Sequence, residues 1–173
     1  NYFTDIVYSK PKLTITLTAT LAQLLGYWNE IYPKSTNVII ILPPIIFLVS
    51  FFKDKVLILF WLFLMLFFSG RLLINGLMDG IIALYFVSSI LTSYKILTTK
   101  KESEKLSLYL SLFIFFTILS LSKNEGGVMV LVIFLSSFFI DFIYERKVNL
   151  KLLFTTAIAL CPISLWKYMF IKS

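Results

Sequence analysis

A succession of long apolar segments, separated by short polar breaks, occupies most of the chain from residue 34 onward. A helix needs about 20 apolar residues to cross a bilayer, and these segments approach that length. Because lipid offers the backbone no hydrogen-bond partners, such segments have to be helical. They cover residues 34–52, 55–69, 80–97, 106–122, 126–144 and 150–170. The predicted fold class is all-α: a polytopic transmembrane helix bundle of about six spanning helices.

The composition agrees with an integral membrane protein. Hydrophobic residues make up 59% of the chain and charged residues 14%, whereas soluble domains average about half and about a quarter. The net charge of +7 does not indicate nucleic-acid binding, because the basic residues stand singly or in short clusters between apolar runs. The chain has no His and a single cysteine, Cys161. We therefore expect no metal, no other cofactor and no intrachain disulfide.

The segment before the first span differs from the others. Residues 1–12 contain Asp5, Lys10 and Pro11 and are predicted to be a loop. Residues 13–28 are apolar but diluted by alternating threonines, and sixteen helical residues extend only about 24 Å, less than the core of about 30 Å. We predict a juxtamembrane helix over 12–28 that does not fully cross. A strand is the alternative that the threonine alternation leaves open.

Lys and Arg in the short loops indicate the orientation of the spans. The clusters Lys100-Lys101 and Arg146-Lys147 fall on one side, which we assign to the cytoplasm. The N-terminal loop, the 71–79 break and the 123–125 break then lie outside. The expected location is a bacterial inner (cell) membrane, with membrane lipid as a partner. Because the chain begins at Asn1, we expect residues 1–173 to be a single transmembrane domain from a longer protein.

Two polar breaks on the predicted outer side carry the candidate site. One is Lys123-Asn124-Glu125-Gly126-Gly127, and the other ends in Asp79-Gly80. A charge facing lipid costs several kcal/mol, so such groups usually face a cavity, a partner or water. Simpler roles stay open: Asp79 and Glu125 can cap their helices, and Arg71 can extend to the interface. Asp141 is expected to pair with the charged cluster at 145–147.

The order of these landmarks resembles that of GT-C membrane glycosyltransferases, including the aminoarabinose transferases and the protein mannosyltransferases. The matching features are Lys10-Pro11 before a helix that ends in Gly26-Tyr27-Trp28-Asn29-Glu30, the Asp79-Gly80 break, Lys123-Asn124-Glu125-Gly126, and Trp166. The resemblance implies transfer of a sugar from a polyprenyl-phosphate-linked donor at the outer membrane face.

The resemblance also implies roles for individual residues. The resemblance makes Lys10 a candidate contact to the donor phosphate. Transfer from a lipid phosphate also needs cations around that phosphate, which Arg71 and Lys123 can supply, so all three are candidate substrate-binding residues. Asp79 and Glu125 are candidates for orienting the acceptor or the sugar. The family's main catalytic aspartate lies in a loop well upstream of the Lys-Pro pair, so we expect it outside residues 1–173. A transporter or flippase subunit is the alternative function, with Asp79 and Glu125 as pathway charges, and a purely structural membrane subunit is the third.

Overall fold

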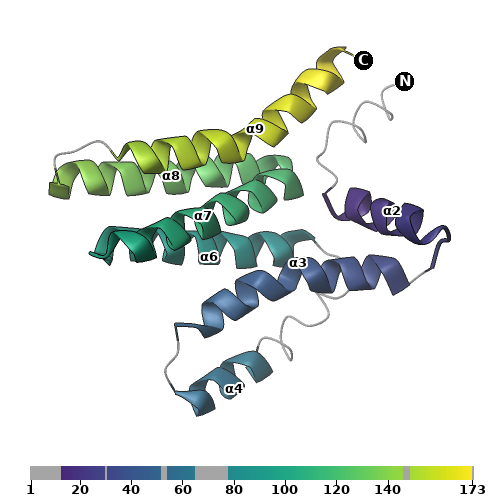
Figure 1. The fold of residues 1–173 in the computed structure, drawn as a ribbon, viewed down its shortest axis with the longest axis horizontal. Coiled ribbons are helices and arrows are strands. Elements are labelled where there is room, and N and C mark those ends of the chain that lie inside the picture. The colour runs from purple at the N-terminus through teal and green to yellow at the C-terminus, as the bar shows by residue number, and fades with distance from the viewer. Residues whose placement is uncertain (1–12, 30, 52–53, 65–77, 146–148, 173) are drawn as a thin grey trace. The chain divides into compact units, whose positions relative to one another are not determined.

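The computed structural model describes residues 13–29, 31–51, 54–64, 78–145 and 149–172. Within these ranges the chain forms seven helices and no strand (Figure 1). They are α2 (Leu13–Leu25), α3 (Ile31–Val49), α4 (Lys55–Leu64), α6 (Met78–Thr98), α7 (Glu102–Ser122), α8 (Asn124–Glu145) and α9 (Leu150–Lys172). The all-α prediction is confirmed for these residues, and the threonine-alternating stretch is a helix rather than a strand.

Among the residues that the structure describes, five helices are long and apolar enough to cross a membrane: α3, α6, α7, α8 and α9. They correspond to five of the six predicted spans, which supports the assignment as an integral membrane protein. The remaining predicted span, 55–69, coincides with α4 as far as Leu64, and its last residues lie outside the described part of the chain. Pro43 and Pro44 lie inside α3, as membrane helices tolerate.

The chain divides into two compact units, an N-terminal unit of Lys12–Leu84 and a C-terminal unit that contains Tyr85–Ser173. In the N-terminal unit, α2 packs against α3. The Thr18 hydroxyl lies 3.2 Å from that of Thr36, and the rings of Tyr27 and Tyr32 are 5.7 Å apart. Gly26 has φ +76°, a left-handed conformation that ends a helix and that glycine adopts without strain. The predicted short helix is therefore confirmed, and its 13 residues span only about 20 Å.

Helix α7 is the centre of the C-terminal unit and packs against both α8 and α9. Leu112, Phe116 and Leu119 on α7 are completely buried. The ring of Phe115 meets that of Tyr85 on α6 edge-on at 5.7 Å. Because Tyr85 lies about two turns after the start of α6 and Phe115 about two turns before the end of α7, these two helices run antiparallel.

The two last helices each bury one narrow stripe. On α9 the buried residues recur at helical spacing: Leu152, Thr156, Ala159 and Ile163. On α8 the stripe consists of Gly126, Val130, Ile133, Ser137 and Asp141. The remaining faces carry exposed apolar side chains, such as Val132, Phe139 and Ile143 on α8. This inside-out distribution fits helices whose outer faces contact lipid.

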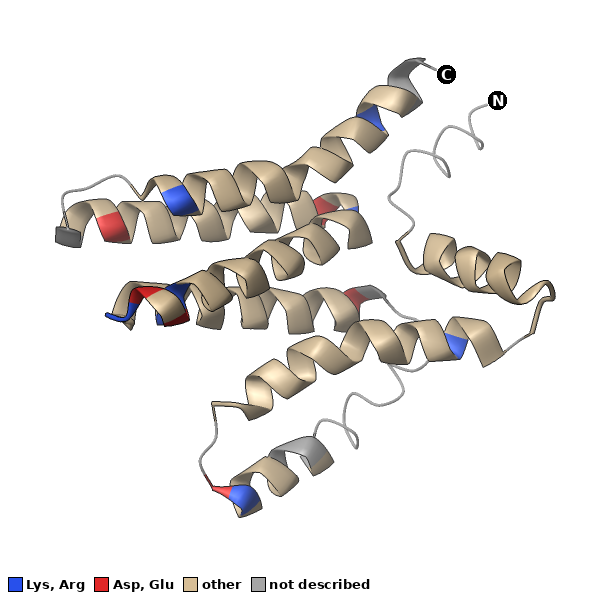
Figure 2. Cartoon of the chain, viewed as in Figure 1, with Lys and Arg blue, Asp and Glu red and all other residues tan. Residues whose placement is uncertain are grey.

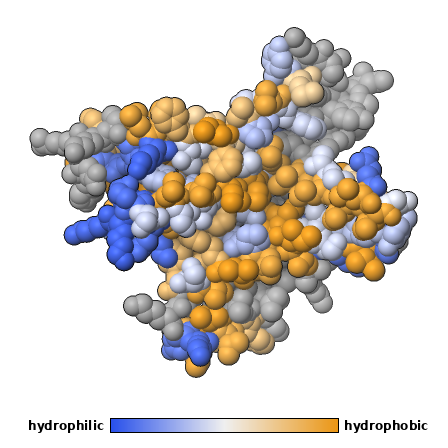
Figure 3. Space-filling view, in the orientation of Figure 1, coloured by the Kyte–Doolittle hydropathy of each residue, from blue (hydrophilic) through white to orange (hydrophobic). Residues whose placement is uncertain are grey.

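The charged residues of the C-terminal unit lie near the helix ends, and the middle of each helix carries none (Figure 2). Hydrophilic atoms gather where α7 and α9 begin, whereas much of the remaining visible surface is apolar (Figure 3). Helix α9 bends along its length, and Pro162 in its second half accounts for the bend because proline cannot donate the intrahelical hydrogen bond (Figure 1). This bend changes the direction of the helix ahead of Trp166.

Candidate functional site

The structure places three of the five predicted site residues. Asp79 is exposed in the first turn of α6, in the N-terminal unit. Lys123 is half-buried and Glu125 is exposed, and both lie in the C-terminal unit at the junction of α7 and α8. Lys10 and Arg71 lie outside the described residues. Because Asp79 belongs to the other unit, its predicted proximity to Lys123 and Glu125 stays a prediction.

The chain reverses direction between α7 and α8 within a single residue. Lys123 alone separates the two helices and adopts an extended conformation, with φ −159° and ψ 159°. Its carbonyl accepts a hydrogen bond of 3.0 Å from the backbone N–H of Gly126. The first turn of α8 therefore folds directly back on Lys123. This turn sets the Lys123 ammonium and the Glu125 carboxylate at the boundary between two consecutive spans.

Gly126 is necessary for this reversal because α8 crosses close to the end of α7. A Cβ atom at Gly126 would overlap the carbonyl oxygen of Leu119, which belongs to the backbone and cannot rotate away. At Gly127 the same atom would lie 3.8 Å from Ile163 Cδ1, an ordinary van der Waals distance. The two adjacent glycines thus have different roles: the first permits close helix approach, and the second faces α9.

Two shielded polar atoms lie at this end of the C-terminal unit. Asn124 Oδ1, in the first residue of α8, and Trp166 Nε1, near the end of α9, are both buried and have no hydrogen-bond partner among the described residues. Buried polar atoms are nearly always paired, so each such exception calls for an explanation. Here one atom is an acceptor and the other a donor.

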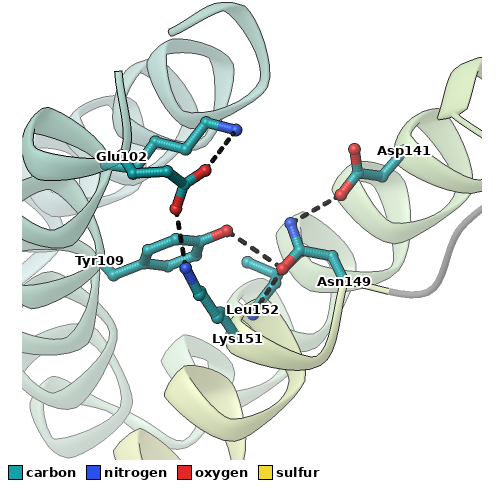
Figure 4. A network of polar contacts seen from close by, with 7 residues as sticks. Glu102, Tyr109, Asp141, Asn149, Lys151 and Leu152 are labelled. Carbon is teal, nitrogen blue, oxygen red and sulfur yellow. Dashed lines mark hydrogen bonds and ion pairs between the residues drawn. The ribbon is translucent and has the colours of Figure 1, made fainter. Parts of the chain in front are cut away.

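The opposite end of the unit carries a polar network that joins α7, α8 and α9 (Figure 4). The Asn149 side chain is at its centre. Its amide donates to Asp141 Oδ2 at 2.7 Å, and its oxygen accepts from the Tyr109 hydroxyl at 3.0 Å and from the backbone N–H of Leu152 at 3.1 Å. Asn149 therefore caps the start of α9 and at the same time ties it to both neighbouring helices.

An ion pair lies beside this network. Lys151 Nζ is 2.8 Å from Glu102 Oε2, and Lys105 Nζ is 3.6 Å from the other carboxylate oxygen (Figure 4). This contact places the starts of α7 and α9 together, so these two helices run parallel. Helix α8, which lies between them in the sequence, runs in the opposite direction. The Lys151 and Glu102 side chains are each 66% exposed, so solvent screens their attraction. We interpret this end as a structural clamp.

Asp141 belongs to the Asn149 network, and its expected pairing with the charged cluster at 145–147 stays a prediction. Its carboxylate is on the buried stripe of α8, with 7% of the residue exposed, and accepts a hydrogen bond from Asn149. The expected partners Arg146 and Lys147 lie outside the described residues. The sequence signal for Asn149 is its position just before an apolar helix, as is usual for a capping residue. No local pattern links it to Tyr109, forty residues away.

The chemistry available at the α7–α8 junction is that of the Lys123 ammonium, the Glu125 carboxylate and the shielded amide oxygen of Asn124. Among the described residues, no group of three or more His, Cys, Asp or Glu side chains is arranged to hold a metal ion. No protein-family model, curated protein or solved structure matches the chain.

Proposed function

We propose that the full-length protein is a membrane glycosyltransferase that moves a sugar from a polyprenyl-phosphate-linked donor to an acceptor at the outer membrane face. One observation supports the proposal most: the Lys123–Gly126 landmark lies at the junction of two apolar helices. A half-buried cation ends one helix there, and a carboxylate lies in the first turn of the next.

The reaction explains why such groups are useful. Transfer breaks the bond between the anomeric carbon and a phosphate oxygen, and the phosphate leaves with the electron pair. The acceptor oxygen or nitrogen forms the new bond and gives its proton to a base. Cations near the phosphate stabilise the charge that develops on it. In this proposal Lys123 contacts the donor phosphate together with Lys10 and Arg71, and Glu125 orients the acceptor or the sugar.

Asp79 is included in the proposed site because the topology of the chain predicts that it lies on the same side of the membrane as Lys123 and Glu125. Successive spans cross the membrane in opposite directions, so α6 and α8, which are separated by α7 alone, begin on the same side. Both helices have an acidic residue in the first turn, Asp79 in α6 and Glu125 in α8. Asp79 and Glu125 are proposed to orient the acceptor or the sugar, and neither is proposed as the catalytic base.

Lys123→Met tests the proposal in the full-length protein. The expected result is a roughly 10- to 100-fold loss of transfer, because a lost charge-assisted hydrogen bond is worth about 1.5–3 kcal/mol. Turnover would be measured in membranes with a panel of polyprenyl-phosphate-linked sugars. Lys100→Met is the matched control, since Lys100 is exposed in the link between α6 and α7 and should have no effect.

Equal activity of the wild type and both variants would remove Lys123 from the mechanism. Absence of transfer with every donor in the panel would contradict the enzyme proposal and favour the transporter alternative. One observation favours that second candidate: α6 buries Ser88, Ser89, Thr92 and Ser93 in its membrane-length segment. The hydroxyls of Ser88 and Ser93 have no hydrogen-bond partner among the described residues, as expected of groups that line a polar pathway.

A further inference from the structure

We propose that α2 enters the lipid leaflet on the predicted outer side at an oblique angle, so that Ile15, Leu17 and Leu24 contact lipid acyl chains. These three side chains are exposed on α2. The alternative is a helix that lies flat along the lipid headgroups. Helices α2 and α3 both belong to the N-terminal unit, so the placement of α2 in the leaflet is independent of the proposed reaction.

Helix α2 lacks the features of a helix that lies flat on a membrane. Such helices have a strongly charged or polar face, commonly rich in Lys and Arg, opposite an apolar face. Residues 13–29 contain no charged side chain. Exposed apolar side chains also lie on opposite sides of α2, because Ile15 and Leu24 are nine residues apart, which is about two and a half turns. This distribution suits a helix with acyl chains on both flanks.

A contact with α3 shows how deep the middle of α2 lies. Helix α3 is a candidate span that begins at Ile31, and α2 lies beside its first half (Figure 1). The Thr18 hydroxyl is 3.2 Å from the Thr36 hydroxyl, and both residues are buried. Thr36 is five residues after Ile31 and therefore about 7.5 Å along the span. Thr18 lies at the same depth, inside the apolar layer.

The end of α2 lies at a shallower level. The Tyr27 ring is 5.7 Å from the ring of Tyr32, in the first turn of α3. Tyr27 and Trp28 are exposed, as is usual for aromatic side chains at the membrane boundary. From Tyr27 back to Thr18, α2 extends about 13.5 Å, whereas Tyr32 and Thr36 differ by only about 6 Å along α3. Helix α2 therefore descends into the leaflet obliquely.

The alternating threonines are compatible with this placement. Polar groups in the apolar layer need hydrogen-bond partners within the protein. The Thr16 hydroxyl donates to the Leu13 carbonyl and the Thr20 hydroxyl to the Thr16 carbonyl, each at 2.9 Å. The Thr18 hydroxyl bonds the Thr14 carbonyl at 2.8 Å in addition to its contact with α3. These hydroxyls are thus satisfied without water, although Thr16 and Thr20 are exposed.

The exposed surface of α3 continues that of α2 at the same depth. Val38 and Ile39 follow Thr36 by two and three residues, and both are exposed. Since α3 is a candidate span, these side chains face lipid. The lipid that surrounds this part of α3 therefore extends over the flanks of α2, where Leu17 lies one residue from Thr18.

Electron paramagnetic resonance of the full-length protein in lipid nanodiscs tests this placement. A nitroxide label is attached to Leu17→Cys or Leu24→Cys in a cysteine-free background that includes Cys161→Ser. Power saturation then compares the accessibility of the label to oxygen, which dissolves in lipid, and to a water-soluble nickel chelate. Oxygen should dominate at both positions. The label at position 17 should lie about 5 Å deeper, because the two positions share a face and are seven residues apart on the inclined helix.

Two further labels calibrate the result. Val38→Cys reports the lipid-facing side of α3, and Lys100→Cys reports the water-exposed link between α6 and α7. Thr16→Cys and Gln23→Cys form a second pair on one face of α2 with the same spacing, so they test the depth difference even if Leu17→Cys does not fold. They should give the same difference.

Three results would overturn the proposal. Equal depths within both pairs would show a flat helix. Nickel accessibility at position 17 as high as at position 100 would place α2 in water. Low accessibility of position 17 to oxygen and nickel alike would show that another part of the protein, rather than lipid, covers α2.

Discussion

At the scale of single residues, Gly126 is the position at which the fold predicts the clearest effect of a substitution. Gly126→Ala puts a methyl group against the Leu119 carbonyl oxygen, so α7 and α8 have to separate. Overpacking of this kind costs about 1–3 kcal/mol. We expect a clearly lowered unfolding temperature for the detergent-solubilised protein, measured by a thermal-shift assay, and a loss of function from the displaced Lys123 and Glu125.

The adjacent glycine supplies the control. Gly127→Ala adds the same methyl group at an ordinary contact distance from Ile163, so its unfolding temperature should stay close to that of the wild type. Equal destabilisation by both substitutions would show that α8 does not approach α7 as described. The sequence predicts a polar break at these glycines, but it cannot distinguish them, because their difference arises from a backbone atom on another helix.

At the scale of elements, Asn149 holds the starts and ends of three helices together. Asn149→Ala removes the cap of α9, the acceptor for Tyr109 and the donor to the buried Asp141 carboxylate. Losing a cap costs about 1 kcal/mol, and leaving buried polar groups unpaired costs about 1–3 kcal/mol more. We expect a loss of about 2–4 kcal/mol in the free energy of unfolding, from the same solubilised protein titrated with denaturant.

Lys151→Ala is the comparison for this effect. It breaks an ion pair whose two side chains are largely exposed, so it should cost no more than about 1 kcal/mol. If Lys151→Ala proves as destabilising as Asn149→Ala, the exposed ion pair rather than the buried amide holds this end of the unit.

The elements themselves were largely predictable from the sequence. Segment length and hydropathy predicted α6 to α9 with ends that differ from the observed ones by at most four residues. The short helix predicted over 12–28 ends earlier, at Leu25, before the left-handed Gly26. The pairing of Tyr109 with Asn149 was not predictable, because it depends on how α7 packs against α9. Tertiary packing brings such residues together, and no local pattern encodes it.

At the scale of the whole molecule, the topology assigns each helix end to a membrane face. In a Cys161→Ser background, single cysteines at Asn29 and Lys100 should react with a membrane-impermeant maleimide from opposite sides of intact vesicles. The reason is that α3 begins after Asn29 on the predicted outer side, whereas Lys100 links α6 to α7 on the predicted cytoplasmic side. Labelling of both positions from the same side would contradict the predicted topology.

We predict that Asp79 and the Lys123–Glu125 junction form one site, although they lie in different units of the chain. Cross-linking tests this directly, with Asp79→Cys and Glu125→Cys in the Cys161→Ser background and a short bifunctional maleimide in native membranes. Efficient intramolecular cross-linking is predicted for this pair. The control pairs Asp79→Cys with Glu104→Cys, which lies at the other end of α7, and should give none. No cross-link between positions 79 and 125, with both cysteines shown to be reactive, would contradict a common site.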